Sequence, residues 1–417
     1  MMKIGFSKKD ISPPVGMELG GYAGYRPCAG VYDPLWCKAV VLEQEDGRYA
    51  LVALDLMCVD EPLYHRIAEA VASLGIRRKR LIVCAIHSHA APAGMIPGAG
   101  VLAEVNAPVH PQDPMIRDYM NNVVTSAAQA CAEAAATMEA FQVRTARGGI
   151  PPVGSERHTG DKPAGALTAI QCRTVSGRLL TVYNFPCHPT VTNAENLQAS
   201  ADFVAGIESR LGGEMAVFLN GAAGDISTRF TRRESTFREC DRMGAIAAEA
   251  VRELISQAEF CEPEPLQGTC ETIVLKARET DAPEVAEKAL AEATALWQEA
   301  LSRGENPDQV RILKSYVEGA GVNLEFARTM AGITQLHLPV SVFRLWGLNF
   351  MSVPGELFSA LLPEDTVVIA YANGYFRYIC DRTAYDRGYY EALAAIVAPG
   401  EGEHLMESIQ QMQNRLV

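Results

Sequence analysis

The chain contains 417 residues and carries a formal net charge of −13, so it has no excess of basic side chains to neutralise phosphate groups. This acidity argues against nucleic acid and against anionic membrane surfaces as partners. Hydrophobic residues make up 48% and charged residues 21% of the sequence, which is typical of a soluble globular protein.

The sequence also lacks signals for export or membrane insertion. The N-terminal residues Met-Met-Lys-Ile are not followed by the apolar stretch of a secretory signal, and no apolar run approaches the roughly 18 residues of a membrane span. We therefore expect no stable membrane insertion. The eleven cysteines are scattered, odd in number and without a Cys-x-x-Cys motif. This pattern indicates buried, reduced thiols and a cytoplasmic location.

The first part of the chain predicts strands that alternate with helices. Residues 39–43 and 49–55 are strand-like runs separated by a Glu-Asp-Gly turn. A helical pattern at 62–74 leads into a strand at 81–85, which is the strand–helix–strand arrangement of a parallel pair. The alternation continues with helices at 116–138, 201–211 and 237–258 and strands at 179–185 and 215–219.

The pattern changes near Ala277. Residues 281–301 keep the helical spacing of apolar side chains, with Asp281 and Glu284 as an expected capping box. A second helix begins at Asn306-Pro307, so residues 281–318 are predicted to form a helical hairpin. Strands return at 336–345, 349–353 and 367–371. We predict one α/β domain over residues 1–417, with a large mixed β-sheet core, flanking helices and a helical insertion at about 279–330.

The segment 83–92 carries the most specific chemical signal, because an apolar strand there ends in His-Ser-His. Residues i and i+2 of a strand point to the same face, so His87 and His89 are expected to enter one cleft. Imidazole is the commonest zinc ligand and a frequent general base. Open α/β sheets place their chemistry at the carboxyl ends of strands.

Polar residues follow other predicted strands as well. They are His188 after 182–185, Asp225 and Ser227 after 216–219, Glu356 after 350–353, and Tyr375 and Tyr378 after 367–371. Together with the His-x-His segment, these positions are typical of a zinc site assembled from separate loops.

Each residue also has a simpler structural explanation. From its local sequence, His188 is expected to be a core histidine that is hydrogen-bonded to the backbone. Glu356 would cap a helix at 357–362. Tyr378 would be an ordinary sheet tyrosine, and Asp225 a turn residue or a support for the site.

The motifs resemble those of the neutral/alkaline non-lysosomal ceramidase family, and most closely its short bacterial members. The likeness covers nearly the whole chain, with the motifs in the same order. They are KKDISPPVG (8–16), GVYDPLWCKAVVLE (30–43), CAIHSHAAPAG (84–94), NFPCHPTV (184–191), FLNGAAGDIS (218–227), VPGELF (353–358) and YANGYFRY (371–378).

The resemblance implies a zinc-dependent amide hydrolase and assigns the ligands of Zn²⁺. These are His87, His188, Glu356 and Tyr378, with Tyr375 as an alternative to Tyr378.

The resemblance also implies catalytic roles. His89 would polarise the substrate carbonyl or shuttle a proton, and Arg157 would contribute to the site. Ser227 is a candidate nucleophile, with a zinc-activated water as the alternative. We favour the water, because zinc lowers the pKa of bound water towards ~7, whereas Ser227 would need its own base.

Some features depart from the family. No C-terminal immunoglobulin-like domain is expected in this chain, and Thr228-Arg229 replaces the usual Pro-Asn after the Gly-Asp-x-Ser motif. An acidic cytoplasmic protein also has no evident way to meet a bilayer lipid, so we expect a soluble small-molecule N-acyl amide as substrate rather than ceramide.

Two other functions stay open at this stage. One is a serine esterase or amidase built on Ser227, and the other is a non-catalytic metal-binding protein on the same scaffold. Manganese, iron or nickel would also suit a His/Glu/Tyr site. The sequence does not define the oligomeric state.

Overall fold

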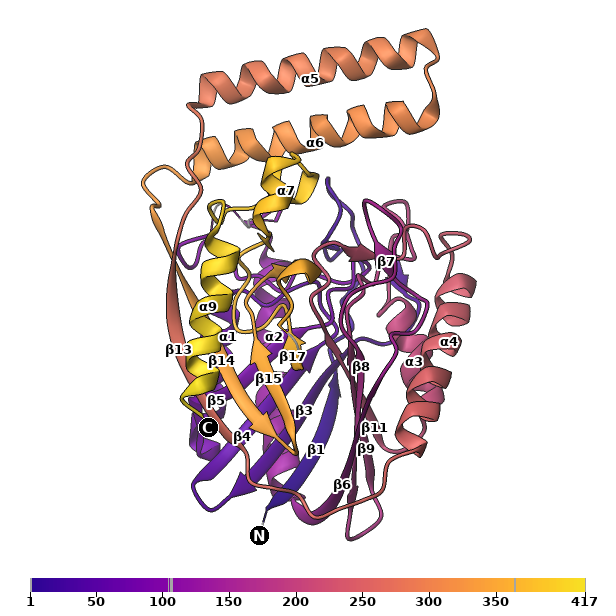
Figure 1. Ribbon diagram of the computed structural model, residues 1–417, viewed down its shortest axis with the longest axis vertical. Coiled ribbons are helices and arrows are strands. Elements are labelled where there is room, and N and C mark those ends of the chain that lie inside the picture. Colours follow the sequence, from indigo (N-terminus) through magenta and orange to yellow (C-terminus); the bar gives the residue numbers. More distant parts are fainter. Residues whose placement is uncertain (1, 104, 106–107, 364, 417) are drawn as a thin grey trace.

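The computed structural model describes residues 2–103, 105, 108–363 and 365–416. Its largest element is an eight-stranded sheet, which confirms the predicted α/β fold with a large mixed sheet (Figure 1). The two outer strand pairs are parallel and the inner pairs are antiparallel. In spatial order the strands are β11 (Met215–Asn220), β9 (Leu179–Phe185), β8 (Leu167–Thr174), β6 (Glu139–Gly148), β1 (Lys3–Asp10), β3 (Trp36–Gln44), β4 (Gly47–Leu54) and β5 (Ile76–Ala85).

Helices cover one face of this sheet. They are α1 (Glu61–Val71) with the 3-10 turn Ala72–Leu74, α2 (Pro114–Ala136), α3 (Phe203–Leu211) and α4 (Phe237–Ser256). Gly5 of β1 allows α2 to pack closely on this strand, since a Cβ at Gly5 would lie 1.8 Å from the carbonyl oxygen of Ala134. Buried strand residues alternate between the two faces. In β3, Val41 packs toward the helices and Val40 packs toward the opposite side.

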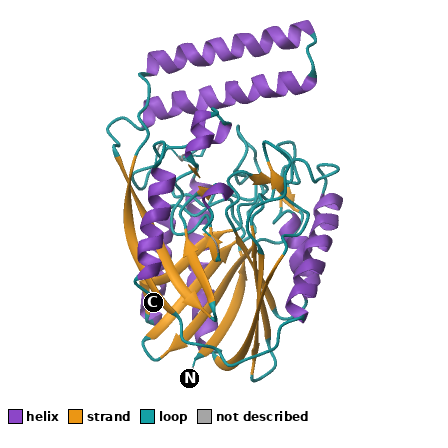
Figure 2. Ribbon diagram, in the orientation of Figure 1, coloured by secondary structure: helices purple, strands orange, loops and turns teal. Residues whose placement is uncertain are grey.

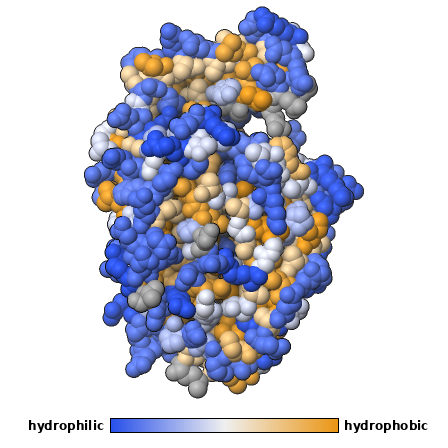
Figure 3. Space-filling model, in the orientation of Figure 1, coloured by the Kyte–Doolittle hydropathy of each residue, from blue (hydrophilic) through white to orange (hydrophobic). Residues whose placement is uncertain are grey.

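A second, four-stranded sheet covers the other face, and its outer side carries α9 (Glu401–Asn414) (Figure 2). Its strands, in order, are β13 (Gln267–Lys276), β14 (Gln335–Leu345), β15 (Leu348–Ser352) and β17 (Thr366–Ile369). A cavity of about 110 Å³ remains between the two sheets. In the orientation of Figure 1, hydrophobic residues gather near the centre of the molecular surface (Figure 3).

The predicted helical hairpin is present and extends away from the sheets (Figure 1). It consists of α5 (Pro283–Arg303) and α6 (Pro307–Thr329), so its second helix is longer than expected. The expected capping box is wrong, because Ala282 occupies the N-cap position and makes no side-chain cap. Asp281 instead accepts a hydrogen bond from Asn323 on α6 at 3.0 Å.

Short elements complete the end of the molecule nearest the hairpin. The paired short strands are β2 (Gly30–Val31) with β10 (Gln198–Ala199), β7 (Ser155–Glu156) with β12 (Ile226–Ser227), and β16 (Glu356–Leu357) with β18 (Tyr378–Ile379). The short helices are the 3-10 turn Ser359–Leu361, α7 (Arg382–Asp386) and α8 (Tyr390–Leu393). In the described part of the chain, no helix combines the length and the apolar character needed to cross a bilayer.

Candidate active site

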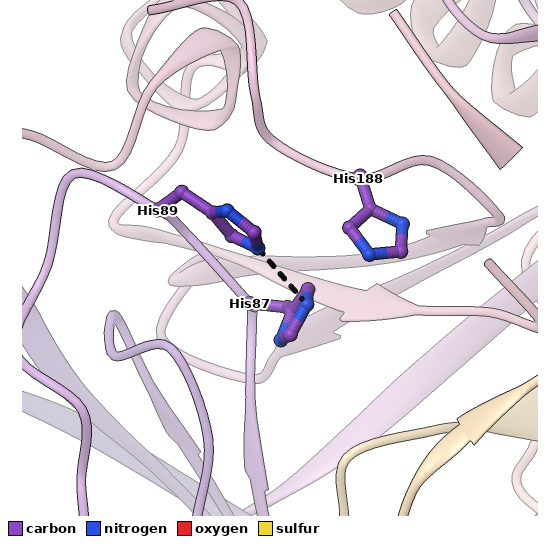
Figure 4. Close-up of side chains that lie close together, drawn as sticks. All are labelled: His87, His89 and His188. Atoms are coloured by element: carbon purple, nitrogen blue, oxygen red, sulfur yellow. Dashed lines mark hydrogen bonds between the residues drawn. The ribbon is translucent and has the colours of Figure 1, made fainter. Parts of the chain in front are cut away.

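Three histidines from two strand ends meet at one edge of the large sheet (Figure 4). His87 and His89 follow β5, and His188 follows β9. A ligand nitrogen from each ring lies within 4.8 Å of the others. The rings converge although the predicted reason is only partly right. β5 ends at Ala85, and His87 lies beyond it with a φ of +70°, so loop geometry rather than strand alternation directs its ring.

Backbone carbonyls fix the orientation of two of these rings. Nδ1 of His87 lies 2.6 Å from the carbonyl oxygen of Met57, and Nδ1 of His188 lies 3.0 Å from that of Ile226. A carbonyl accepts only, so each Nδ1 carries the proton and donates it. In the neutral rings, the Nε2 lone pairs of His87 and His188 are therefore directed into the site, as in metal-binding histidines.

Glu356 completes this group from β16. Its Oε2 lies 2.9 Å from Nε2 of His188 and 3.4 Å from Nε2 of His87. Nε2 of His89 lies 3.2 Å from Nε2 of His87. Zinc bound tetrahedrally by nitrogen and oxygen at about 2.0–2.1 Å separates its ligand atoms by roughly 3.4 Å. The separations of these donor atoms are therefore close to those between the ligands of a bound metal ion.

The buried carboxyl of Glu356 and the imidazole of His188 together form an environment suited to a cation. Burial opposes ionisation of Glu356, but His87 and His188 hold its pKa well below the usual range. Burial lowers the pKa of His188 to about 4. Oε2 of Glu356 and Nε2 of His188 thus face each other at hydrogen-bond distance in the interior of the protein. A bound cation would satisfy both groups, so the residues fit a metal ion.

His89 has a different environment from the other two histidines. Its Nδ1 is buried and lacks a hydrogen-bond partner among the described residues. Burial and the neighbouring His87 and His188 hold its pKa well below the usual range. Its ring meets Tyr22 edge-on at 4.9 Å. Gly21 has a φ of +88°, and a Cβ there would lie 2.4 Å from Cγ of His89, so this position requires glycine.

Arg157 approaches the same site from the strand pair β7–β12. It follows β7, and its backbone N–H donates to the carbonyl oxygen of Asp225 at 2.8 Å. Its guanidinium is buried, and Nη1 lies 3.4 Å from the Tyr378 hydroxyl and 3.1 Å from a carboxylate oxygen of Glu391. A buried cation therefore lies beside the predicted metal ligand Tyr378.

Two tyrosines, the predicted ligand Tyr378 and its alternative Tyr375, differ in their contacts. Tyr375 donates its hydroxyl proton to Oε1 of Glu356 at 2.6 Å, whereas the contact of Tyr378 is with Arg157. Both tyrosines thus adjoin the histidine–glutamate group, and the assignment of Tyr378 as a ligand stays a prediction.

Ser227 is buried next to His188 but has little to activate it. The two residues form an isolated parallel bridge. In the part of the chain that the structure describes, the hydrogen bond of Ser227 Oγ is a long one, 3.4 Å from the backbone N–H of Arg229. Activation of a serine requires a base within hydrogen-bond reach, so this environment favours water as the nucleophile.

Neither a protein-family model nor a curated protein matches this chain in sequence. Among solved structures, neutral ceramidase from Pseudomonas aeruginosa matches with a TM-score of 0.76 at 15% identity, over 99% of this chain and 74% of that chain. The chain has the fold of neutral ceramidase. A ceramidase complexed with C2 matches with a TM-score of 0.71 at 15% identity, over 100% of this chain and 76% of that one. The resemblance indicated by the sequence motifs is thus confirmed, and at this identity it is the fold that the likeness establishes.

Within this ceramidase fold, sequence reasoning missed contacts that have no local motif. The ring of Tyr371 stacks on His87 with centroids 4.0 Å apart, and its buried hydroxyl has no hydrogen-bond partner among the described residues. Glu391 contacts Arg157 across 234 positions of sequence. Tyr371 lies in the motif at 371–378, so its position there was a signal that the sequence offered. Glu391 lies in none of the motifs, so the sequence offered no signal for it.

Asp225 gives a pH-dependent prediction. Its carboxylate accepts hydrogen bonds from N and Oγ of Ser359 at 2.8 and 2.7 Å, yet burial raises its pKa from 3.8 to about 6. The folded protein then holds this proton more tightly than the unfolded chain, so stability falls as pH rises from about 4 to about 6. Asp225→Asn keeps an acceptor and cannot ionise. Over this interval the stability of the variant relative to wild type should rise, by up to about 3 kcal/mol.

Urea unfolding of both proteins at several pH values checks this expectation. A stability difference that is independent of pH would contradict it, because the only change between the two side chains that titrates in this range is the carboxyl group.

Proposed function

We propose that this protein is a zinc-dependent hydrolase that cleaves the amide bond of a small N-acyl compound. The observation that carries the proposal is the convergence of Glu356 Oε2 with Nε2 of His188 at 2.9 Å and Nε2 of His87 at 3.4 Å, while backbone carbonyls hold Nδ1 of both rings. The ceramidase fold supports amide hydrolysis as the reaction class, because the solved structures that share it are ceramidases.

Each residue has a defined part in this proposal. His87, His188 and Glu356 would hold the metal, with Tyr378 as the fourth ligand from the protein. Zinc, when bound, supplies an activated water and polarises a carbonyl. His89 would donate a hydrogen bond to the substrate carbonyl or move a proton, and Arg157 would stabilise negative charge on the carbonyl oxygen.

Two observations support water rather than Ser227 as the nucleophile. Among the described residues, the hydrogen bond that the Ser227 hydroxyl makes is the 3.4 Å contact with the backbone N–H of Arg229. The imidazole of His188, whose backbone adjoins Ser227, is directed by its Nδ1 toward Ile226 and by its Nε2 toward Glu356. Neither nitrogen is therefore directed at Ser227 to act as its base.

The proposal extends to the substrate and the compartment. The net charge of −13 favours a soluble N-acyl amide over ceramide in an anionic bilayer. All eleven cysteines are free thiols, which supports the proposed cytoplasmic location.

Metal content tests the proposal most directly. Plasma mass spectrometry should find about one zinc per chain in wild type and almost none in His188→Ala. His404→Ala is the matched control, because His404 lies on the surface of α9 and pairs with Glu401. Hydrolysis of a panel of short N-acyl amides and of ceramide should follow zinc content and stop with a chelator. Full activity in the metal-free protein would overturn the proposal.

A further inference from the structure

Glu391 is a buried acid that the proposed function does not yet use. It lies on the four-residue helix α8 and is 3% exposed. Burial opposes ionisation, but the close contact with His158 and the charge of Arg157 lower its pKa to about 2. A charge that is kept ionised in a protein interior needs a specific partner, because desolvation is otherwise costly.

The partners of Glu391 are consecutive residues of the site. Its Oε1 lies 3.1 Å from Nη1 of Arg157, and its Oε2 lies 3.2 Å from Nε2 of His158. The ring of His158 stacks on Tyr389 with centroids 3.6 Å apart and planes 8° from parallel. The carboxylate thus holds two neighbouring side chains at once, one of which adjoins the proposed metal ligands.

The guanidinium of Arg157 depends on this contact. Nε of Arg157 is buried and has no hydrogen-bond partner among the described residues, and Nη1 has only a long contact with Tyr378 in addition to Glu391. Glu356 is the other buried carboxylate whose charge acts on Arg157. Without Glu391, the cation would be drawn toward Glu356 and would compete there with a metal ion.

Helix α8 is itself fixed by the hairpin. Arg278 donates to the carbonyl oxygen of Leu393 at 2.7 Å and to Oδ1 of Asn323 on α6 at 3.0 Å. The two helices also pack closely, since a Cβ at Gly319 of α6 would lie 2.7 Å from Cδ1 of Leu393. Glu391 is therefore carried by a rigid support rather than by a free loop.

We propose that Glu391 is a positioning residue that holds Arg157 beside the metal site and away from Glu356. This inference rests on the proposed function, in which Arg157 stabilises charge on the substrate carbonyl. Glu391 does not touch the substrate in this account. Its effect on catalysis passes entirely through the position of the Arg157 guanidinium.

A double-mutant cycle tests that dependence. Glu391→Gln, Arg157→Ala and the double variant are compared by kcat and KM, with zinc content measured in each. Glu391→Gln should lower kcat by about 10- to 100-fold, and the double variant should match Arg157→Ala. Independent, additive losses would overturn the proposal. Glu271→Gln is the matched control, because Glu271 pairs with Arg415 at the surface.

A second measurement does not depend on hydrolysis. In protein labelled with 15N-arginine, the Nε–H resonance of Arg157 is identified by its loss in Arg157→Ala. In Glu391→Gln this resonance should shift, in both the zinc-loaded and the metal-free protein, while Glu271→Gln leaves it unchanged. An unchanged resonance would overturn the positioning role. If the Arg157 resonance shifts in Glu391→Gln but wild type hydrolyses no substrate, the positioning role stands and the proposed function is wrong.

Discussion

Replacing Glu356 with glutamine is expected to remove zinc from the protein while making the metal-free protein more stable. In wild type, Oε1 of Glu356 accepts the hydroxyl proton of Tyr375, and Oε2 faces Nε2 of His188 and of His87. Glutamine keeps the first acceptor and places an N–H donor at the second position. The metal-free variant therefore no longer buries a carboxylate, and its amide donates to a neutral imidazole, a gain of about 1–3 kcal/mol.

The same change should weaken zinc binding by more than the 10- to 100-fold typical of changes around a metal site, because it removes a charged ligand. Thermal unfolding with and without zinc measures both effects. Added zinc at 100 times Kd stabilises a protein by about 2.7 kcal/mol, so Tm of wild type should rise with zinc and that of the variant should not. If metal-free Glu356→Gln were less stable than metal-free wild type, the carboxylate would be protonated or paired in some other way. Glu214→Gln, at a surface pair with Arg178, is the control.

Replacing His89 with alanine is expected to leave zinc in place and to remove most of the activity. Nε2 of His89 has the spacing of a ligand to its neighbour His87, at 3.2 Å, so geometry alone allows either role. Unlike His87 and His188, however, His89 has no carbonyl among the described residues that accepts from Nδ1 and orients the ring for a metal. We therefore expect His87, His188 and Glu356 to keep the ion.

The expected loss in kcat is about 10²- to 10⁴-fold, the usual contribution of a group that transfers a proton or stabilises charge in the transition state. KM should change little. Zinc content and steady-state kinetics of His89→Ala check this, with His65→Ala on the exposed face of α1 as the control. Loss of zinc from His89→Ala would instead make His89 a ligand and the site a three-histidine one.

The local sequence was sufficient to single out most residues that the fold brings together in the candidate site. Apolar strands precede the His-x-His segment (β5), His188 (β9) and Glu356 (β15). Polar side chains that directly follow such strands lie at one edge of the sheet. Length and hydrophobic periodicity likewise predicted the hairpin of α5 and α6, because helical spacing is a local property.

Some strands escaped prediction for a related reason. β6 and β13 contain many polar side chains, and each has just two buried residues, which are Phe141 and Val143 in β6 and Ile273 and Leu275 in β13. Their position in a sheet therefore depends on partners that are distant in sequence. β6 pairs with β8 and with β1, and β13 is an edge strand held by β14. Their pairing is a consequence of tertiary packing rather than of their own composition.

The sequence by itself determined which residue types are available and where strands end, and therefore the presence of histidines, a glutamate and tyrosines at one edge of the sheet. The tertiary structure alone decided which atoms meet. The carbonyls of Met57 and Ile226 set the proton positions on His87 and His188, and Glu391 reaches Arg157 across the fold. Such contacts join segments far apart in the chain, so their distances follow from packing of the whole core and no local pattern encodes them.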